Sequence, residues 1–304
     1  MERLDGRKLQ GIVVPTVTPL NEREEVQLDA LRKLNEHMMK GGVHGLFPLG
    51  TTGEFARMDD EQKEQVARVT IEQAAGRVPV YVGVGDTGTR KVLRNMKKAH
   101  SWGADVIVST LPYYYPVNDE REQLQYFEAI AASTDLPVMM YNMPATVGVN
   151  IAPSVVERLS HVPNIIGIKD SSGNYDYIHA CLRIKKASSQ VFQIFVGDES
   201  LSARALLAGA DGLVPSLGNV FPKLLVQLYE ACAAKEHERA EDLQQELSII
   251  NQFNKVGDSW LGALILRKKL LSMMGLSPEK VSHPSLAMDS AADDKLDRFI
   301  KKWA

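Results

Sequence analysis

The sequence predicts an α/β fold, a closed (β/α)8 TIM barrel with a C-terminal helical extension. The first observation is that short apolar runs, many rich in β-branched residues, alternate with segments of helical periodicity. The second is that these runs are apolar almost throughout, as expected for a parallel sheet covered by helices. The third is their number, since eight such units close a barrel. The runs are residues 11–19, 44–50, 78–85, 104–110, 136–142, 164–170, 192–198 and 211–216.

Helical patterns fill the intervals between these runs. Apolar residues recur at the spacing of one helix face, at Leu28, Leu31, Leu34 and Met38 after the first run and at Leu224, Leu228 and Cys232 after the last. Asp59 followed by Gln62 is typical of a capping box at a helix start. Because proline is favoured in the first helical turn, we also expect helices to begin at Pro153, Pro222 and Pro278.

No linker or low-complexity segment divides the chain. We expect residues 1–236 to form the catalytic barrel and residues 237–304 to form the helical extension. The extension contains no convincing strand. Its helical patterns lie near Leu243 to Ile250, over 260–274 and over 291–303.

Composition excludes several classes of protein. The 304 residues are 44% hydrophobic and 24% charged, which describes a soluble globular chain, and the net charge of −3 gives no reason to expect a nucleic-acid or membrane partner. Residues 1–10 lack the apolar segment of a signal peptide, and no run of about 18 apolar residues follows. Cys181 and Cys232 lie far apart without CxxC spacing. We therefore expect reduced thiols and a cytoplasmic protein.

The sixth run, NIIGIKD, ends on a lysine, which is the first candidate for chemistry. Because side chains alternate along a strand, we expect Ile165, Gly167 and Lys169 on one face. Ile166 and Ile168 would share the other. If the first face is the barrel interior, Gly167 leaves space beneath Lys169, which then lies at the C-terminal end of the barrel, where barrel enzymes place their active sites. The alternative is a lysine that extends into solvent.

An interior lysine at this position suits nucleophilic catalysis. Desolvation lowers a lysine pKa from ~10.4 and raises the fraction of neutral amine, which forms Schiff bases with carbonyl substrates. Tyr141 ends the neighbouring fifth run, where a phenol can transfer protons. GTTGEF, residues 50–55, follows the second run and can present N–H groups to a carboxylate. Taken singly, Tyr141 also fits a packing residue, and the GTTG turn fits a plain connection.

Three motifs in combination resemble one family. GTTGE at 50–54, YNMP at 141–144 and GIKD at 167–170 are similar, in sequence and order, to motifs of the dihydrodipicolinate synthase and N-acetylneuraminate lyase family, and the likeness extends over nearly the whole chain. The resemblance implies a pyruvate-dependent class I aldolase on a (β/α)8 barrel. It implies no cofactor, because the substrate is bound covalently as a Schiff base on a lysine of the protein. It further implies a homotetramer built from dimers. Tyr114, in LPYYYPV, matches a tyrosine contributed across the dimer interface, although the tyrosine triplet also fits the aromatic rim of a loop.

The same resemblance implies roles for individual residues. Lys169 falls on the Schiff-base lysine and Tyr141 on the proton-transferring tyrosine. Thr51 matches the relay threonine. Thr52, with Gly50 in the same turn, matches the contact to the pyruvate carboxylate.

Two departures from the family pattern bear on the substrate. Lysine-pathway synthases carry an arginine two residues after the proline of the YNxP motif, where it binds the carboxylate of the aldehyde. Here that position is Thr146, so the bidentate partner is missing. Asp198 and Glu199 end the seventh run and resemble the acidic pair that sialic acid lyases and related sugar-acid aldolases direct at substrate hydroxyls, and Ser216 matches a hydroxyl contact of that branch. The alternative for the two acids is an N-cap and a first-turn acid.

Other enzyme classes fit less well. GVGDTG at 83–88 is a GxGxxG motif, but Asp105 begins the next run instead of ending it, so the acid of a dinucleotide site is missing. Seven scattered histidines without HxxxH spacing disfavour a metal-dependent aldolase. A non-catalytic member that binds pyruvate or a sugar acid as a regulatory ligand is disfavoured by intact Lys169, Tyr141 and Thr51.

We therefore expect a lyase that reversibly cleaves a 2-keto-3-deoxy sugar acid or a sialic acid to pyruvate and an aldehyde. Its partners would be these small molecules, with no metal, nucleic acid or membrane. The remaining alternatives are 4-hydroxy-tetrahydrodipicolinate synthase of lysine biosynthesis and a Schiff-base dehydratase of the same family.

Overall fold

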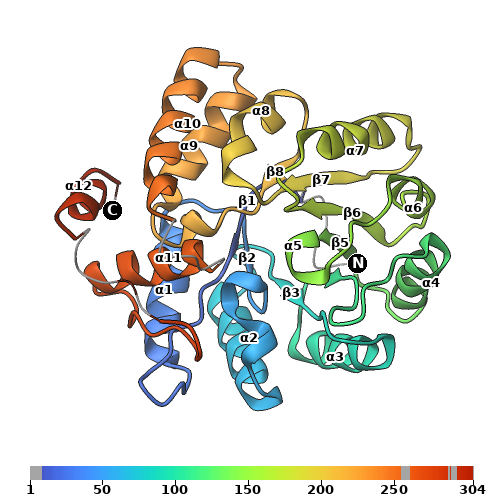
Figure 1. Cartoon of the computed structure of the whole chain (residues 1–304), viewed down its shortest axis with the longest axis horizontal. Helices are drawn as coiled ribbons and strands as arrows, with labels where there is room; N and C mark the ends of the chain where they lie inside the picture. Colours follow the sequence, from blue (N-terminus) through green and yellow to red (C-terminus); the bar gives the residue numbers. More distant parts are fainter. Residues whose placement is uncertain (1–8, 255–260, 287, 289–292, 304) are drawn as a thin grey trace.

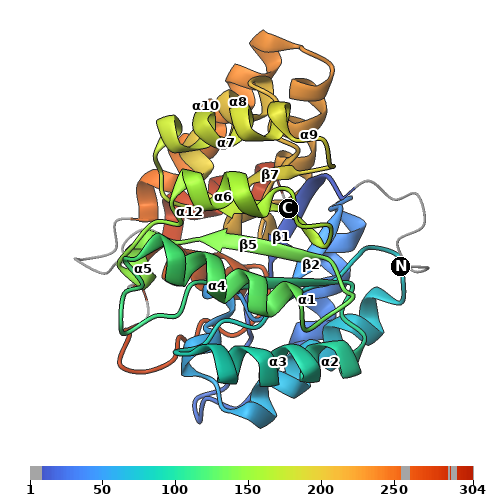
Figure 2. The ribbon, with the colours of Figure 1, turned by 90° about the vertical axis from the view of Figure 1, so that its right-hand side faces the viewer.

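Eight parallel strands form a barrel at the centre of the computed structural model, which describes residues 9–254, 261–286, 288 and 293–303. Helices surround the strands (Figure 1, Figure 2). The strand order is β2-β1-β8-β7-β6-β5-β4-β3, and a parallel bridge between Leu46 and Val80 links β2 to β3. The predicted (β/α)8 barrel is therefore confirmed. The strands are β1 (Gly11–Pro15), β2 (Gly45–Phe47), β3 (Tyr81–Gly83), β4 (Val106–Thr110), β5 (Val138–Asn142), β6 (Ile165–Asp170), β7 (Gln193–Val196) and β8 (Gly212–Leu213).

Helices connect successive strands and continue beyond β8. Those of the barrel are α1 (Leu28–Lys40), α2 (Asp60–Ala74), α3 (Thr89–Trp102), α4 (Glu120–Ala131), the short α5 (Pro144–Val147), α6 (Pro153–Leu159), α7 (Tyr175–Ala187), α8 (Ser202–Leu207) and α9 (Pro222–Ala233). The C-terminal part contains α10 (His237–Asn251), α11 (Gly262–Met273) and α12 (Asp293–Trp303). Residues 260, 291 and 292 of the predicted C-terminal helices lie outside the described residues.

The predicted helix starts are confirmed at three of four positions. Asp59 and Gln62 form the capping box of α2, and Pro153 and Pro222 lie in the first turns of α6 and α9. The expected helix at Pro278 is wrong, because the chain is irregular there. Two backbone groups of this segment instead bind buried side chains, since the Lys280 carbonyl accepts from the Lys268 amine and the Ser282 N–H donates to the Glu54 carboxylate.

Two apolar layers stabilise the barrel. Side chains that point inward, including Val13, Phe47, Tyr81 and Phe195, form a small interior cluster. Outward-pointing residues such as Ile12 pack with the helices in a much larger cluster. The alternation of strand side chains separates the two layers. The interior between the strands is therefore a packed core formed by side chains.

Strand β6 departs from simple alternation. Its pairing with β5 shifts register, so that Ile166 is an extra residue between the positions opposite Val138 and Met139. As a result Ile165 packs outside the barrel, whereas Ile166 packs against the interior cluster. The predicted sharing of faces by Ile165 and Lys169, and by Ile166 and Ile168, is therefore wrong, because a bulge resets the alternation.

The thiols of Cys181 and Cys232 are buried and unbridged in α7 and α9, as expected. Among the described residues, no helix has the length and apolar character needed to cross a bilayer. The same residues contain no group of three or more His, Cys, Asp or Glu side chains arranged to hold a metal ion.

Candidate active site

Lys169 lies inside the barrel near the C-terminal end of β6, with 3% of its surface exposed. Its Nζ atom is 3.8 Å from the centroid of the Tyr141 ring and 5.0 Å from that of Phe47. Burial lowers the pKa of Lys169 below its ordinary value, although the charge and hydrogen bond of Tyr141 oppose this effect. The amine is therefore held in the apolar setting that favours its neutral, nucleophilic form.

A glycine of the neighbouring strand keeps room for this lysine. A Cβ atom on Gly197 would stand 3.1 Å from Cε of Lys169 and 2.1 Å from Oγ of Ser171. Gly167 has a different role from the one expected. A Cβ atom there would stand 2.1 Å from the Gln193 carbonyl oxygen, so this glycine permits the close approach of β7.

Tyr141 and Thr51 form a hydroxyl pair beside the lysine. Tyr141 is directly opposite Lys169 in the β5–β6 ladder, and its hydroxyl is 3.3 Å from Oγ1 of Thr51. Burial, the largest effect on the Tyr141 pKa, raises it. The Lys169 charge and hydrogen bonds from Thr51, Lys169 and Ser171 together outweigh burial, so that the pKa lies below the ordinary value. A phenol in this setting can give and take protons next to the amine.

A cavity of about 470 Å³ opens from these residues. It brings together most of the predicted site, namely Lys169, Tyr141, Thr51, Thr52, Asp198 and Ser216. Among the described residues, its wall is completed by Pro15, Met143, Ala145, Ser171, Gly197, Val214, Leu261, Ala263 and Leu264. Its size and mixed lining are those of a small-molecule site.

Thr51 and Thr52 belong to a tight turn after β2. The turn is a single 3-10 helical segment, Thr51–Gly53. Thr18 fixes it, because its hydroxyl donates to the Gly53 carbonyl over 2.9 Å. Gly50 supports the turn from behind and is not part of the cavity wall, since a Cβ atom there would stand 3.2 Å from the Phe47 ring.

The two acids after β7 have different surroundings. Asp198 lines the cavity, and its Oδ1 atom accepts from the N–H (2.9 Å) and hydroxyl (2.6 Å) of Ser200. Glu199 is buried and pairs with the Arg267 guanidinium, with 2.6 Å between Oε2 and Nη2. Its Oε1 atom accepts from the Leu217 N–H at 2.7 Å and the Ser216 hydroxyl at 3.0 Å. Asp198 thus faces the cavity, whereas both oxygens of Glu199 already have protein partners.

Asp170, which follows the lysine, does not line the cavity. The Asn142 amide and the Ser172 hydroxyl donate to its carboxylate over 2.7 and 2.9 Å. Burial, the largest effect, raises the pKa of Asp170, and these hydrogen bonds oppose it. The side chain joins the ends of β5 and β6 and so fixes the position of Lys169.

Two other predicted residues lie outside the lysine cavity. Thr146 lines a neighbouring cavity of about 450 Å³ that shares Thr51 and Leu261 with it. Tyr114 is 79% exposed and has a left-handed φ of 81°. Such a conformation costs about 1–3 kcal/mol in a residue other than glycine, so it persists only where the surrounding structure holds it.

Sequence reasoning missed the two buried cations of α11. Arg267 pairs with Glu199, and Lys268 pairs with Glu54, with 2.5 Å between Nζ and Oε1. Both side chains have no exposed surface. Three consecutive cations within the otherwise apolar stretch LILRKKLL, of which these are the first two, were a usable signal, because lysine and arginine are almost never fully buried unless paired.

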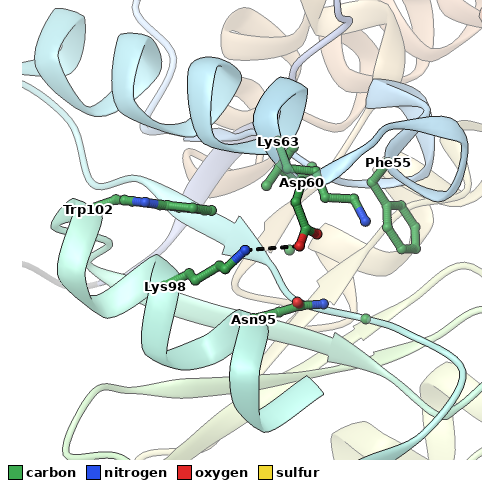
Figure 3. A pocket seen from close by; sticks show the side chains of 9 residues that line it. Phe55, Asp60, Lys63, Asn95, Lys98 and Trp102 are labelled. Carbon is green, nitrogen blue, oxygen red and sulfur yellow. Dashed lines mark hydrogen bonds and ion pairs between the residues drawn. The ribbon is translucent and has the colours of Figure 1, made fainter. Parts of the chain in front are cut away.

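A separate pocket between α2 and α3 is too small for a ligand. Figure 3 shows Lys98 from α3 reaching Asp60 at the start of α2, with 3.0 Å between Nζ and Oδ2. The pocket shares no lining residue with the lysine cavity and offers about 10 Å³, close to the minimum for one water molecule. This pocket therefore has no room for a substrate.

Comparison with known proteins identifies the family of the chain. The model of the dihydrodipicolinate synthetase family matches residues 8–303. A 4-hydroxy-tetrahydrodipicolinate synthase of Methanospirillum hungatei is 33% identical over 241 residues, covering 79% of this chain and 81% of its own length. A protein of the same name from Syntrophus aciditrophicus is 31% identical over 300 residues, covering 97% and 98%.

Solved structures are similar over almost the whole chain. YagE of E. coli K12, a prophage protein of the dihydrodipicolinic acid synthase family solved with pyruvate, matches with a TM-score of 0.90 at 30% identity, covering 97% of this chain and 98% of YagE. Dihydrodipicolinate synthase of Bacteroides thetaiotaomicron matches with a TM-score of 0.90 at 33% identity over the same shares. The chain therefore belongs to the dihydrodipicolinate synthetase family, and it is a lyase of the pyruvate-dependent class I aldolase type that reacts through a lysine Schiff base without an external cofactor.

Proposed function

We propose that Lys169 forms the Schiff base with pyruvate and that the chain makes or cleaves a 2-keto-3-deoxy sugar acid or a sialic acid. The observation that carries the proposal is the buried Lys169 amine, 3.8 Å from the centroid of the Tyr141 ring, in a cavity that also contains Asp198 and Ser216. The presence of pyruvate in the YagE structure supports the choice of keto acid.

In the cleavage direction, the neutral amine of Lys169 attacks the C2 ketone of the sugar acid. Loss of water gives an iminium, and its positive nitrogen accepts the electron pair of the C3–C4 bond as that bond breaks. The C4 hydroxyl loses its proton to Tyr141 and leaves as the aldehyde. The resulting enamine takes a proton at C3, and water then releases pyruvate and restores the amine.

Tyr141 and Thr51 are proposed to move these protons together. Their hydroxyls are 3.3 Å apart, which is slightly longer than a typical O–H···O bond, and such contacts often tighten when substrate binds. Tyr114 would extend the relay from a second subunit. Its high exposure supports this role, since an aromatic side chain held in solvent is available to a partner.

The pyruvate carboxylate is proposed to bind at the Thr51–Gly53 turn. The first N–H groups of a helical turn have no carbonyl partner inside the turn. Together with the Thr51 and Thr52 hydroxyls they can surround an anion. Both threonines line the lysine cavity, which supports this orientation of the keto acid. Gly50 contributes by letting the turn pack on Phe47.

The far end of the cavity supports a polyhydroxylated acceptor. Asp198 and Ser216 line it and can bind hydroxyl groups, with Glu199 behind them. Thr146 lacks the cation that would bind an acceptor carboxylate. We also propose a cytoplasmic homotetramer built from dimers, for which the free thiols and the family resemblance are the support.

Synthesis of 4-hydroxy-tetrahydrodipicolinate is the second candidate, and the names of several similar relatives favour it. A Schiff-base dehydratase would use the same iminium. The deciding experiment is a substrate panel, in which purified protein is tested with aspartate semialdehyde, sugar-derived aldehydes and 2-keto-3-deoxy sugar acids. Efficient turnover of aspartate semialdehyde alone would reject the sugar-acid proposal in favour of the synthase.

A further inference from the structure

A guanidinium with no exposed surface lies directly behind the cavity wall. Arg267 in α11 donates to Glu199 Oε2 (2.6 Å), to the side-chain oxygens of Asn251 (2.8 Å) and Asn254 (2.5 Å), and, from Nε, to Ser216 Oγ (3.2 Å). An arginine side chain has only donors. Its contact with Ser216 therefore uses one lone pair of that hydroxyl.

The hydroxyl proton of Ser216 is also used in a hydrogen bond. Ser216 donates to Glu199 Oε1 over 3.0 Å, and an ionised carboxylate has only acceptors. A hydroxyl group has one proton and two lone pairs. Ser216 uses its proton in the hydrogen bond to Glu199 and one lone pair in the hydrogen bond from Arg267. A single lone pair of its oxygen therefore remains. Because Ser216 lines the lysine cavity, this lone pair is what it can offer to a ligand.

Asp198 adds further hydrogen-bond acceptors to the same wall of the cavity. Its carboxylate lines the cavity, and the two hydrogen bonds from Ser200 reach only Oδ1. The wall at the ends of β7 and β8 thus presents acceptors, whereas the turn after β2 holds the donors of Thr51 and Thr52. A bound molecule must then be anionic at one end and carry hydrogen-bond donors at the other.

We propose that Arg267 is a specificity-determining positioning residue, which together with Glu199 locks Ser216 as a hydrogen-bond acceptor toward the cavity. The site then selects an acceptor aldehyde with a hydroxyl group at this position and rejects one that places a carboxylate or carbonyl oxygen there. A mismatched oxygen leaves two buried acceptors facing each other without a proton. The inference rests on the proposed aldol reaction and deepens it, because it assigns the acceptor chemistry to residues behind the wall.

The first test replaces Ser216 with alanine and compares two aldehydes in condensation with pyruvate. D-Glyceraldehyde carries a terminal hydroxyl, and lactaldehyde is the same chain without it. We expect the wild type to prefer glyceraldehyde by about tenfold or more in kcat/KM, as for a hydrogen bond in a desolvated site. Ser216→Ala should remove most of this preference. An unchanged preference in Ser216→Ala would overturn the inference.

The second test frees the hydroxyl of Ser216 while leaving the residue in place. The double variant Glu199→Met/Arg267→Met replaces the ion pair with apolar side chains of similar length, a change that proteins often tolerate, whereas either single change leaves a buried charge. Ser216 can then turn its proton into the cavity. We expect kcat/KM for succinic semialdehyde, relative to glyceraldehyde, to rise by about tenfold, and Ser216→Ala added to the double variant to abolish this gain. Merely structural damage would not produce a gain that depends on Ser216.

Two controls separate the possible failures. Borohydride labelling of Lys169 with pyruvate is measured on the wild type, so that an absence of labelling counts against the proposed Schiff-base chemistry itself. If labelling occurs but the double variant keeps the wild-type ratio of the two aldehydes, the positioning role of Arg267 is overturned. A gain with succinic semialdehyde that survives Ser216→Ala would also overturn it.

Discussion

Lys169 and Tyr141 lie opposite each other in neighbouring strands, and the amine of one stands 3.8 Å from the ring centroid of the other. Each side chain changes the titration of its neighbour. The cation lowers the pKa of the phenol, and the phenol opposes the loss of charge that burial imposes on the amine. The two side chains can therefore pass a proton between them while both remain buried, and Schiff-base formation and aldol cleavage require such proton transfers.

The assignment of Lys169 predicts where pyruvate is trapped. Borohydride reduction in the presence of pyruvate should add one reduced pyruvate to the peptide containing IGIKDSSG and abolish activity. Lys169→Arg should fold but remain unlabelled, because a guanidinium stays protonated at neutral pH. Peptide mass spectrometry locates the label, and its appearance on a different lysine would remove Lys169 from the mechanism.

Titration of Lys169 should also be visible in stability. Because its folded pKa lies below the ordinary value of 10.5, the unfolded chain binds more protons in the interval between the two. Unfolding free energy of the wild type should thus rise with pH across this interval, relative to Lys169→Met. Tyr141 contributes with the same sign, since the variant loses the cation that lowers its pKa. Urea unfolding of both proteins at about pH 7 and about pH 10 measures the difference, and a wild-type stability that falls with pH relative to the variant would contradict the lowered pKa.

The sequence predicted the barrel and the position of Lys169 because both depend on local patterns. A run of apolar residues that ends on a lysine is visible without any knowledge of its neighbours. The bulge at Ile166 could not be predicted in this way, because it depends on the register in which β6 pairs with β5. The pairing of Glu199 with Arg267 joins residues 68 positions apart and has no periodic signature. Charges buried by distant partners are therefore the part of the site that needed the structure.

Thr146 predicts discrimination against aspartate semialdehyde. A hydrogen bond to a charged group contributes about 1.5–3 kcal/mol, so the wild type should use this aldehyde about 10–150-fold less well than an enzyme that has the arginine. Thr146→Arg should recover part of that factor in kcat/KM, whereas Thr146→Gln, which is long but neutral, should not. Wild-type turnover of aspartate semialdehyde equal to that of the best sugar-derived acceptor would show that position 146 does not decide the substrate.

Tyr114 predicts a link between assembly and catalysis. If it enters the active site of a second subunit, Tyr114→Ala should lower kcat by about 10–100-fold and weaken self-association. Tyr115→Ala is the matched control, because Tyr115 is equally aromatic, 75% exposed and in contact with Tyr114. Sedimentation velocity and steady-state kinetics at several protein concentrations test both effects. Equal behaviour of the two variants would argue against a specific role for Tyr114.

The ion pair of Glu54 and Lys268 predicts a strong dependence of stability on both partners. Lys268 has no exposed surface, and burial, opposed by Glu54, lowers its pKa. Glu54→Gln should therefore cost about 3–5 kcal/mol, because it leaves the ammonium without its partner charge, and Lys268→Met should cost a similar amount for the carboxylate. Glu54→Gln/Lys268→Met should cost much less than the sum of the single changes, as expected for two residues in direct contact.

The same double variant tests whether the pair also positions the active site. Glu54 follows the Thr51–Gly53 turn directly, and its Oε2 atom accepts from the Ser282 N–H over 2.8 Å, so the carboxylate joins this turn to the segment after α11. Because the side-chain carbonyl introduced by Glu54→Gln can still accept that bond, the double variant should keep KM for pyruvate within about threefold of the wild type while urea unfolding shows its recovered stability. If the losses of unfolding free energy in the two single variants simply add in the double variant, the two charges do not stabilise each other. A double variant of recovered stability with a KM raised by about tenfold or more would instead show that the charge of Glu54 is needed to hold Thr51 and Thr52 in place.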